Sequence, residues 1–298
     1  AKMVFPGPHL DGESLVELIQ KEGVTLSAAV PTVWLGILQY LKKSGKDLGS
    51  LERVVIGGTA APPVMVRTLQ EEYGVRVCHA WGMTEMSPLG TTGVLKKTAA
   101  NLPKDEQYKL QEKQGRGLFG VEMKIVDGSG AELPRDGIAF GNLLVRGPWI
   151  AKEYFKGEGG QILDDDGWFD TGDVATLDSE GYMQITDRAK DVIKSGGEWI
   201  GSIELENVAM EHEAVAECAV IGVSHPKWDE RPLLVVVKEP DVEVTANELI
   251  DFYSGKIAKW WTPDDVVFIE ELPHTPTGKV LKTKLREMYA EYVLPTAS

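Results

Sequence analysis

The sequence predicts an α/β chain: part of a large domain with sheet layers and an antiparallel, barrel-like β subdomain, followed by a small α+β domain. Three observations lead to this prediction. Up to about residue 115, strand and helix patterns alternate, which is typical of a mainly parallel sheet covered by helices. Short strands separated by Asp-Gly and Ser-Gly turns then run to about residue 186, as in antiparallel hairpins. After residue 188 strands and helices alternate again.

In the first part, apolar spacing and glycine stops define the elements. Leu15, Leu18 and Ile19 share one helical face, and Gly23 ends that helix. The elements expected after it are a strand over 24–30, a helix over 33–43, a strand over 53–56, a helix over 63–73 and a strand over 75–80.

The middle part is expected to contain strands over 123–126, 139–146 and 182–186. The acidic segment around Thr171-Gly172-Asp173 is interpreted by itself as a polar turn between such strands.

In the last part, Thr245 and Glu248 have the spacing of a capping box, which predicts a helix from there to about residue 259. Helices over 203–210 and 282–289 and strands over 219–222, 233–238 and 266–269 complete the pattern. We therefore predict domains over 1–188, with its β-rich subdomain at about 115–186, and over 189–298.

Composition indicates a globular protein that does not bind nucleic acid. The 298 residues are 43% hydrophobic and carry a net charge of −15, whereas phosphate backbones favour basic surfaces. No run reaches the roughly 18–20 apolar residues of a membrane helix. Cys78 and Cys218 form no metal-binding pattern, so we expect two thiols in a reducing compartment, the cytoplasm.

Two segments at strand ends have the chemistry of a nucleotide site. Gly57-Gly58-Thr59 ends a strand, and its glycines allow a ligand to approach the backbone closely, although the segment taken alone favours a plain strand–helix turn. In Trp81-Gly82-Met83-Thr84-Glu85, the indole can stack on a base, the hydroxyl can reach a phosphate and the carboxylate can hold Mg²⁺. A buried tryptophan beside an exposed Thr-Glu pair is the alternative.

Three later segments carry further polar groups. Asp173 can accept two hydrogen bonds from the vicinal hydroxyls of a ribose, and Arg188, 15 positions later, can reach the same nucleotide. Lys190, Lys194 and the Ser195-Gly196-Gly197 loop follow, and solvated surface lysines are the plain alternative for the first two. The Gly278-Lys279 pair is not a P-loop, because Val280 follows it and no glycine stands at the Walker spacing.

Together and in this order, these motifs resemble those of the adenylate-forming enzymes, and the resemblance covers essentially the whole chain. It implies that Trp81 packs on adenine, Thr84 contacts the α-phosphate, Glu85 binds Mg²⁺ and Asp173 binds ribose. It also implies that a small mobile domain acts as a lid, with Lys190 as its hinge. The full set of site residues that we carry over consists of Trp34, Gly57, Gly58, Thr59, Trp81, Gly82, Thr84, Glu85, Pro88, Asp173, Arg188, Lys190, Lys194, Ser195, Gly196, Gly197 and Lys279.

By the same resemblance, Lys279 is the catalytic cation of adenylation, and Lys194 belongs to the thioester-forming half-reaction. Ser195, Gly196 and Gly197 lie near coenzyme A, and Trp34, Gly82 and Pro88 lie beside the acyl substrate. Pro273, Thr275, Gly278 and Lys282 complete the motif around Lys279. ATP, Mg²⁺ and coenzyme A are the cofactors implied, a small carboxylic acid is the substrate, and a homodimer is the common assembly.

Within this family, segments such as Val55-Ile-Gly-Gly58 and Lys194-Ser-Gly-Gly-Glu-Trp-Ile200 are most similar to bacterial short- to medium-chain fatty acyl-CoA ligases, including 3-methylmercaptopropionyl-CoA ligases. We therefore expect an ATP-dependent acid:CoA ligase whose substrate includes thioether acids. The family's Ser/Thr/Gly-rich phosphate loop has no match, so we expect the C-terminal part of a longer protein, inactive alone. An adenylation domain that loads a carrier protein and a non-catalytic nucleotide-binding module are the alternatives.

Overall fold

The computed structural model describes residues 1–275 and 279–297, which divide into two compact units. The first unit contains residues 1–171 and 175–185, and the second contains residues 172–174 and 186–298. The middle of one strand, Gly172–Val174, thus belongs to the second unit. No helix in the described ranges is long and apolar enough to cross a membrane.

The first unit is built on a nine-stranded sheet with the strand order β1-β2-β3-β4-β5-β9-β8-β7-β6. Its strands are β1 (Leu26–Ala29), β2 (Arg53–Ile56), β3 (Arg76–Gly82), β4 (Leu89–Thr92), β5 (Gly115–Gly117), β6 (Glu122–Val126), β7 (Phe140–Arg146), β8 (Phe169–Leu177) and β9 (Tyr182–Arg188). Its helices are α1 (Gly12–Glu22), α2 (Pro31–Ser44), α3 (Pro63–Glu71) and α4 (Lys104–Glu112), with 3₁₀ turns η1 (Thr84–Met86), η2 (Lys97–Asn101) and η3 (Phe155–Gly157).

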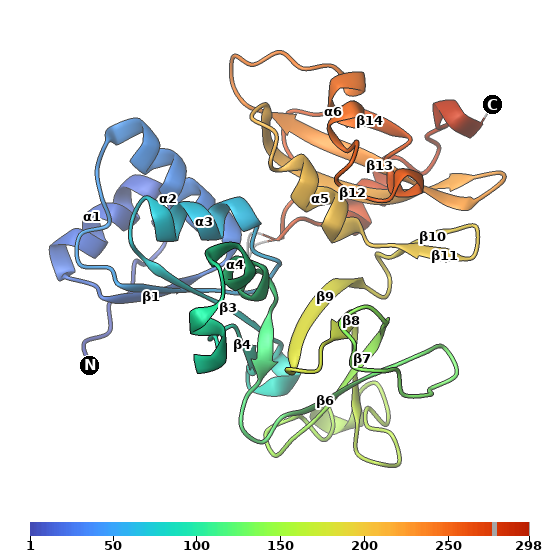
Figure 1. Ribbon diagram of the computed structural model, residues 1–298, viewed down its shortest axis with the longest axis horizontal. Coiled ribbons are helices and arrows are strands. Elements are labelled where there is room, and N and C mark those ends of the chain that lie inside the picture. Colours follow the sequence, from blue (N-terminus) through green and yellow to red (C-terminus); the bar gives the residue numbers. More distant parts are fainter. Residues whose placement is uncertain (276–278, 298) are drawn as a thin grey trace. The chain divides into compact units, whose positions relative to one another are not determined.

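The parallel part of this sheet follows the predicted alternation of strands and helices. β1 pairs with β2, and β2 pairs with β3, all in parallel. Helices α1, α2 and α3 lie together beside these strands (Figure 1). Their apolar faces form one core, which includes Val16, Trp34, Ile37, Val54 and Leu69. Asp11 caps α1 with its side chain, which accepts a hydrogen bond from the Ser14 amide, and Gly23 ends the helix at a φ of 62°.

The β-rich part corrects two expectations. Its strands do not close into a barrel: in the described residues they continue the same sheet as an open path that ends at β6. The segment expected to be a turn around Asp173 is instead inside the nine-residue strand β8. Seven of its residues, at alternate positions and then in a continuous run, are buried, so pairing within the sheet outweighs the turn preference of Gly172.

The second unit contains a five-stranded sheet with the order β11-β10-β13-β12, and β14 pairs with β13 in parallel. The strands are β10 (Ile193–Ser195), β11 (Glu198–Ile200), β12 (Val215–His225), β13 (Asp229–Lys238) and β14 (Asp265–Phe268). The helices are α5 (Ser202–Ala209), α6 (Ala246–Phe252) and α7 (Lys282–Met288), with 3₁₀ turns η4 (Lys259–Trp261) and η5 (Pro295–Ala297).

Two apolar cores lie on the two faces of this sheet, because residues of β12 and β13 alternate between them. Val220 and Leu234 belong to the core with α5 and α6, whereas Ile221 and Leu233 belong to the core with α7. The predicted capping box is present, since Thr245 and Glu248 exchange both of its hydrogen bonds. The helix that it begins ends at Phe252 and not near residue 259, because turns follow and Gly255 adopts a φ of 76°.

Candidate active site

In the first unit, the carboxyl ends of β1, β2 and β3 bring the two predicted strand-end segments together. The Gly57 amide donates to the Ala29 carbonyl over 3.4 Å. A Cβ on Gly57 would lie 3.1 Å from the Ala80 carbonyl oxygen, so β2 and β3 end side by side. Gly58 has a φ of 94°, and Thr59 is exposed beside it. Nucleotides bind at this edge of an open parallel sheet.

Trp81 and Gly82 end β3 in a closely packed turn. The Trp81 side chain belongs to the apolar core of the β-rich part and is 7% exposed, so its stacking on adenine stays a prediction. Gly82 admits no side chain, because a Cβ there would lie 1.9 Å from the Pro88 carbonyl oxygen. The backbone therefore folds tightly between Gly82 and Pro88, which places the short turn η1 directly after the strand.

The turn η1 carries Thr84 and Glu85 at the surface. Thr84 is exposed, and one carboxylate oxygen of Glu85, Oε1, accepts a hydrogen bond from the Tyr154 hydroxyl over 2.7 Å. This bond to the carboxylate raises the pKa of the Tyr154 phenol. The described residues contain no group of three or more His, Cys, Asp or Glu that could enclose a metal. Glu85 nonetheless fits Mg²⁺, which one carboxylate and substrate phosphates commonly hold.

The two residues predicted to lie beside the acyl group have very different surroundings. Pro88 is exposed within the closely packed turn that follows β3. Trp34 is fully buried in the helical core of the first unit, and among the described residues its Nε1 hydrogen has no hydrogen-bond acceptor. Trp34 therefore has the surroundings of a packing residue, and its contact with a substrate stays a prediction.

In the second unit, the predicted ribose ligand and its neighbouring arginine are paired. Nε of Arg188 lies 2.8 Å from Oδ1 of Asp173, and the Asp173 side chain is 2% exposed, against 48% for Arg188. The Ala189 amide donates to the Gly172 carbonyl over 2.9 Å, which holds the end of β9 against the middle of β8. The structure therefore brings Asp173 and Arg188 together across 15 positions of sequence.

A buried charge network lies next to this pair. The carboxylate of Asp187 accepts hydrogen bonds from the amides of Arg188, over 2.7 Å, and Ser202, over 2.6 Å. Nζ of Lys282 lies 2.6 Å from Oε1 of Glu206, and it donates to the Ser202 hydroxyl. The network thus connects the end of β9 to α5 and α7.

Burial and charge act in opposite directions in this network. Burial raises the pKa of Asp187 and of Glu206 above the usual carboxyl range, and Lys282 only partly offsets it. Burial acts to lower the pKa of Lys282, but the charges of Glu206 and Asp187 outweigh it and raise that pKa.

The predicted hinge residue, Lys190, is exposed in a turn after β9. The amides of Asp191 and Val192 both donate to the Arg188 carbonyl, over 2.8 and 2.9 Å, which closes the turn. The Asp191 carboxylate pairs with Arg286 of α7. Lys190 therefore lies between two residues that form ion pairs, Arg188 and Asp191, and its role as a hinge stays a prediction.

The loop predicted near coenzyme A is a two-residue hairpin between β10 and β11, and not an irregular loop. Gly196 and Gly197 have φ values of 61° and 89°, the combination that such hairpins require. A Cβ on Gly196 would lie 2.8 Å from the Trp228 ring. Ser195 is buried, and its hydroxyl accepts a hydrogen bond from Arg231 over 3.2 Å. Lys194 precedes it with an exposed side chain.

Lys279 lies in a loop that begins at an isolated bridge between His274 and Val280. The Thr275 amide donates to the Lys279 carbonyl over 2.8 Å, and the Lys279 amide donates to the Thr275 hydroxyl over 3.1 Å. The Lys279 side chain is half-buried. Gly278 of the predicted motif lies outside the described residues.

The structure also shows polar residues that the sequence did not point to, namely Tyr154, Asp191, Ser202, Glu206 and Arg286. Tyr154 and Arg286 form their bonds with residues 69 and 95 positions away, Glu85 and Asp191. Ser202 and Glu206 belong to the buried charge network. Lys282, a partner of Glu206 and Ser202, did have a sequence signal, as the last position of the motif around Lys279. Local patterns contain no information about such distant partners.

Two families match this chain. Residues 1–155 match the family described as "AMP-binding enzyme", and residues 204–279 match "AMP-binding enzyme C-terminal domain". The chain is 57% identical over 291 residues to a 3-methylmercaptopropionyl-CoA ligase of Ruegeria lacuscaerulensis, which covers 98% of this chain and 54% of the relative. It is 50% identical over 298 residues to a medium-chain-fatty-acid–CoA ligase of Ectopseudomonas oleovorans, with coverage of 100% and 54%. The chain therefore spans about half the length of the curated relatives it matches.

Solved structures show the same fold. The anthranilate CoA ligase AuaEII, solved in complex with anthranoyl-AMP, superposes with a TM-score of 0.83 at 27% identity, over 96% of this chain and 54% of that one. ATP-bound MatB from Rhodopseudomonas palustris superposes with a TM-score of 0.78 at 28% identity, over 94% of this chain and 54% of that one. The predicted α/β class is thus confirmed, and in the described residues the barrel-like part is an open sheet.

Proposed function

Because this chain belongs to the AMP-binding enzyme family, we propose that the protein containing it is an ATP-dependent acid:CoA ligase. The reaction converts a short- to medium-chain carboxylic acid, with thioether acids included, into its coenzyme A thioester through an acyl-adenylate. The names of the two relatives support this choice of reaction, since both are CoA ligases.

One structural observation carries the proposal. The Gly57–Thr59 and Trp81–Glu85 segments lie at the carboxyl ends of adjacent parallel strands, β2 and β3. This edge offers exposed backbone at Gly58, a hydroxyl at Thr84 and a carboxylate at Glu85. These are the groups that a nucleotide and its bound cation require.

In the first half-reaction, an oxygen of the substrate carboxylate attacks the α-phosphorus of ATP, and the bond to pyrophosphate breaks. The attack brings negative charges together, so it depends on positioning and on cations. We assign the Lys279 ammonium to the developing charge, the Thr84 hydroxyl to the α-phosphate and Asp173 to the ribose, with Arg188 holding Asp173. When bound, Mg²⁺ supplies charge neutralisation on the phosphates, and Glu85 is the residue that would hold it.

In the second half-reaction, the thiolate of coenzyme A attacks the acyl carbonyl carbon, and AMP leaves with the electron pair of the broken C–O bond. We assign Lys194 and the Ser195-Gly196-Gly197 hairpin to this step. Because Lys194 and Lys279 serve different steps over one nucleotide, we propose that the domain after residue 188 rotates about Lys190 between them. Trp34, Gly82 and Pro88 are assigned to the acyl substrate.

The experiment that tests this function uses the full-length protein with ATP, Mg²⁺ and acids from propionate to decanoate, together with thioether acids. Pyrophosphate release that depends on the acid, followed by thioester formation with coenzyme A, is the expected result. K279A should lower pyrophosphate release by about 100-fold or more, because the charge on the phosphates loses its fixed cation. D173N should weaken ATP binding by roughly 10- to 100-fold, the effect of losing a charge-assisted hydrogen bond.

The outcomes also separate the alternatives. Transfer of the acyl group to a carrier protein but not to coenzyme A would identify an adenylation domain. Binding of ATP without pyrophosphate release or acyl-AMP, for every acid tried, would identify a non-catalytic nucleotide-binding module.

We also propose a reducing compartment, the cytoplasm, because Cys78 and Cys218 are both free thiols. A homodimer is proposed on the resemblance to the family alone, and sedimentation of the full-length protein would test it.

A further inference from the structure

A strap of six residues, Trp149–Tyr154, crosses the turn that follows β3. The Ala151 amide donates to the Glu85 carbonyl over 2.7 Å. The Ser87 hydroxyl donates to the Trp149 carbonyl over 3.1 Å, and the Trp149 indole donates to the Leu89 carbonyl over 3.1 Å. Three hydrogen bonds thus tie the strap to the turn, two at the backbone carbonyls of Glu85 and Leu89 and one at the Ser87 hydroxyl.

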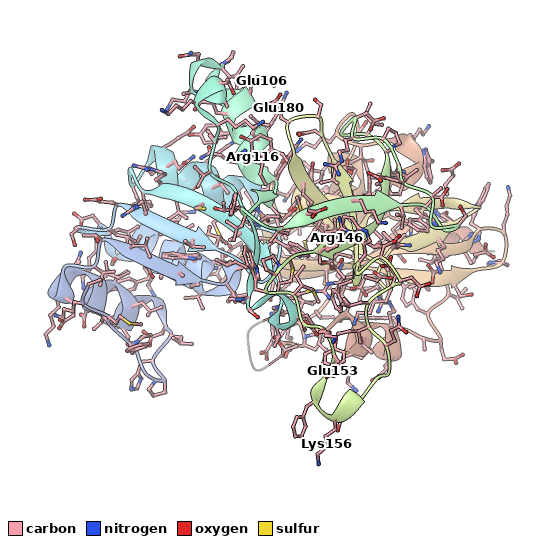
Figure 2. The ribbon with its side chains drawn as sticks, turned by 90° about the horizontal axis from the view of Figure 1, so that it is seen from below. Glu106, Arg116, Arg146, Glu153, Lys156 and Glu180 are labelled. Atoms are coloured by element: carbon pink, nitrogen blue, oxygen red, sulfur yellow. The ribbon has the colours of Figure 1, made fainter. Side chains whose placement is uncertain are left out.

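Tyr154, the last residue of the strap, adds a bond of a different kind. Its hydroxyl donates to Oε1 of the Glu85 carboxylate over 2.7 Å, within the 2.5–3.0 Å range of O–H···O bonds. Figure 2 labels its neighbours Glu153 and Lys156 on the same loop, with the Lys156 side chain directed outward. The strap therefore determines where the turn lies, and Tyr154 determines where the carboxylate points.

A carboxylate has two oxygens, so a bond on one is compatible with a metal on the other. A carboxylate that binds a metal is usually itself hydrogen-bonded, because that bond fixes its orientation before the ion arrives. A glutamate side chain without such a partner loses more rotamer freedom when it binds.

We propose that Tyr154 is a positioning residue, which holds the Glu85 carboxylate in the orientation that receives the nucleotide-bound Mg²⁺. This inference rests on the proposed function, in which Glu85 is the metal ligand. The exposure of Tyr154, 40%, separates this role from a purely structural one. An exposed phenol contributes little to the core, so its removal should affect the metal and leave the fold intact.

The test is Y154F in the full-length protein, which removes the hydroxyl and keeps the ring. Isothermal titration measures the Kd of ATP with Mg²⁺ and with EDTA. The ratio of the Kd with EDTA to the Kd with Mg²⁺ gives the factor by which the metal tightens nucleotide binding. In Y154F we expect this ratio to fall by about tenfold, the usual cost of losing such a partner. The Kd of metal-free ATP and the KM of the acid should not change, and the Mg²⁺ concentration for half-maximal adenylate formation should rise by a similar factor.

Y292F is the matched control. Tyr292 also donates to a carboxylate, Oδ2 of Asp265, over 2.6 Å, but this pair lies in the second unit and has no role in the proposed site. Y292F should leave the Kd of ATP unchanged, both with Mg²⁺ and with EDTA.

Three outcomes would overturn the inference. An unchanged ratio in Y154F would show that Tyr154 does not position the metal ligand. An equal loss with and without Mg²⁺ would show that it supports the turn as a whole. A wild-type protein that binds no ATP would overturn the proposed function and this inference with it, so the two failures are distinguishable.

Discussion

The turn after β3 and the turn after β9 are held by different forces. The first, Gly82–Leu89, is fixed by steric exclusion at Gly82 and by hydrogen bonds with the strap, most of them between neutral groups. The second, Asp187–Ser195, is fixed by charges, since Asp187, Arg188 and Asp191 each face a residue of opposite charge or an amide donor. Both turns carry proposed site residues.

This difference predicts how each turn responds to pH and to the loss of a charge. Steric exclusion and neutral hydrogen bonds do not depend on protonation, so the turn after β3 should keep its geometry over a wide pH range. Buried ion pairs depend on the charge state of every member, so the turn after β9 should respond to pH and to single charge deletions.

K282M is the change with the largest expected effect on this comparison. It leaves the Glu206 carboxylate, whose side chain is 20% exposed, without the cation that lies 2.6 Å away. We expect the second unit to lose about 3–5 kcal/mol, because breaking a buried pair strands the other charge. Native-state hydrogen exchange of residues 202–209 and 215–225 measures the loss.

The double variant K282M/E206M is the control for that prediction. It removes both charges, and it should recover part of the stability that K282M loses. A loss below 1 kcal/mol in K282M would contradict the view that charge holds this turn.

G82A is the corresponding change in the first unit. The new methyl group would lie 1.9 Å from the Pro88 carbonyl oxygen, so the backbone must move. We expect a loss of about 1–3 kcal/mol from overpacking. A shift of about 1 Å in the turn should also lower adenylate formation by roughly 100-fold. Thermal unfolding and pyrophosphate release measure the two effects.

G36A is the matched glycine control, because a Cβ at position 36 of α2 meets no heavy atom within 4 Å. It should raise stability by about 0.5–1 kcal/mol, the usual gain for alanine over glycine inside a helix. Wild-type activity in G82A would show that the turn after β3 is less closely determined than its packing suggests.

The smallest expected effect is the pH dependence of the second unit. Burial raises the pKa of Glu206 above its ordinary value of 4.5, so the folded protein holds that proton more tightly than the unfolded chain does. Its contribution to stability is therefore complete below pH 4.5 and is lost as pH rises through the raised pKa. The free energy of unfolding should fall across this window by at most about 1.4 kcal/mol per pH unit. E206Q should flatten the slope.

D11N is the control for the pH experiment. A hydrogen bond from the Ser14 amide lowers the pKa of Asp11, so this residue contributes above pH 3.8 and its contribution is lost on acidification, the opposite direction. D11N should not change the slope above pH 4.5, and an E206Q slope identical to that of the wild type would contradict the assignment to Glu206.

Much of the candidate site could be proposed from the sequence, because its residues lie in short ordered motifs. The spacing in Trp81–Glu85 and the adjacent glycines at 57 and 58 mark two strand ends, and the structure places these ends side by side. Tyr154 could not be found this way, because its partner is 69 positions away and the intervening strands alone bring the two together.

By itself, the sequence determined the alternation of strands and helices, the capping box at Thr245 and the family. These depend on local spacing, dihedral preference and residue type, which a linear pattern contains. Only the tertiary structure decided that Asp173 lies within a strand, that the β-rich strands remain an open sheet and that Lys282 is buried against Glu206. Such features depend on which distant segments share a core or a ladder, and burial then fixes the strength of each charge and hydrogen bond.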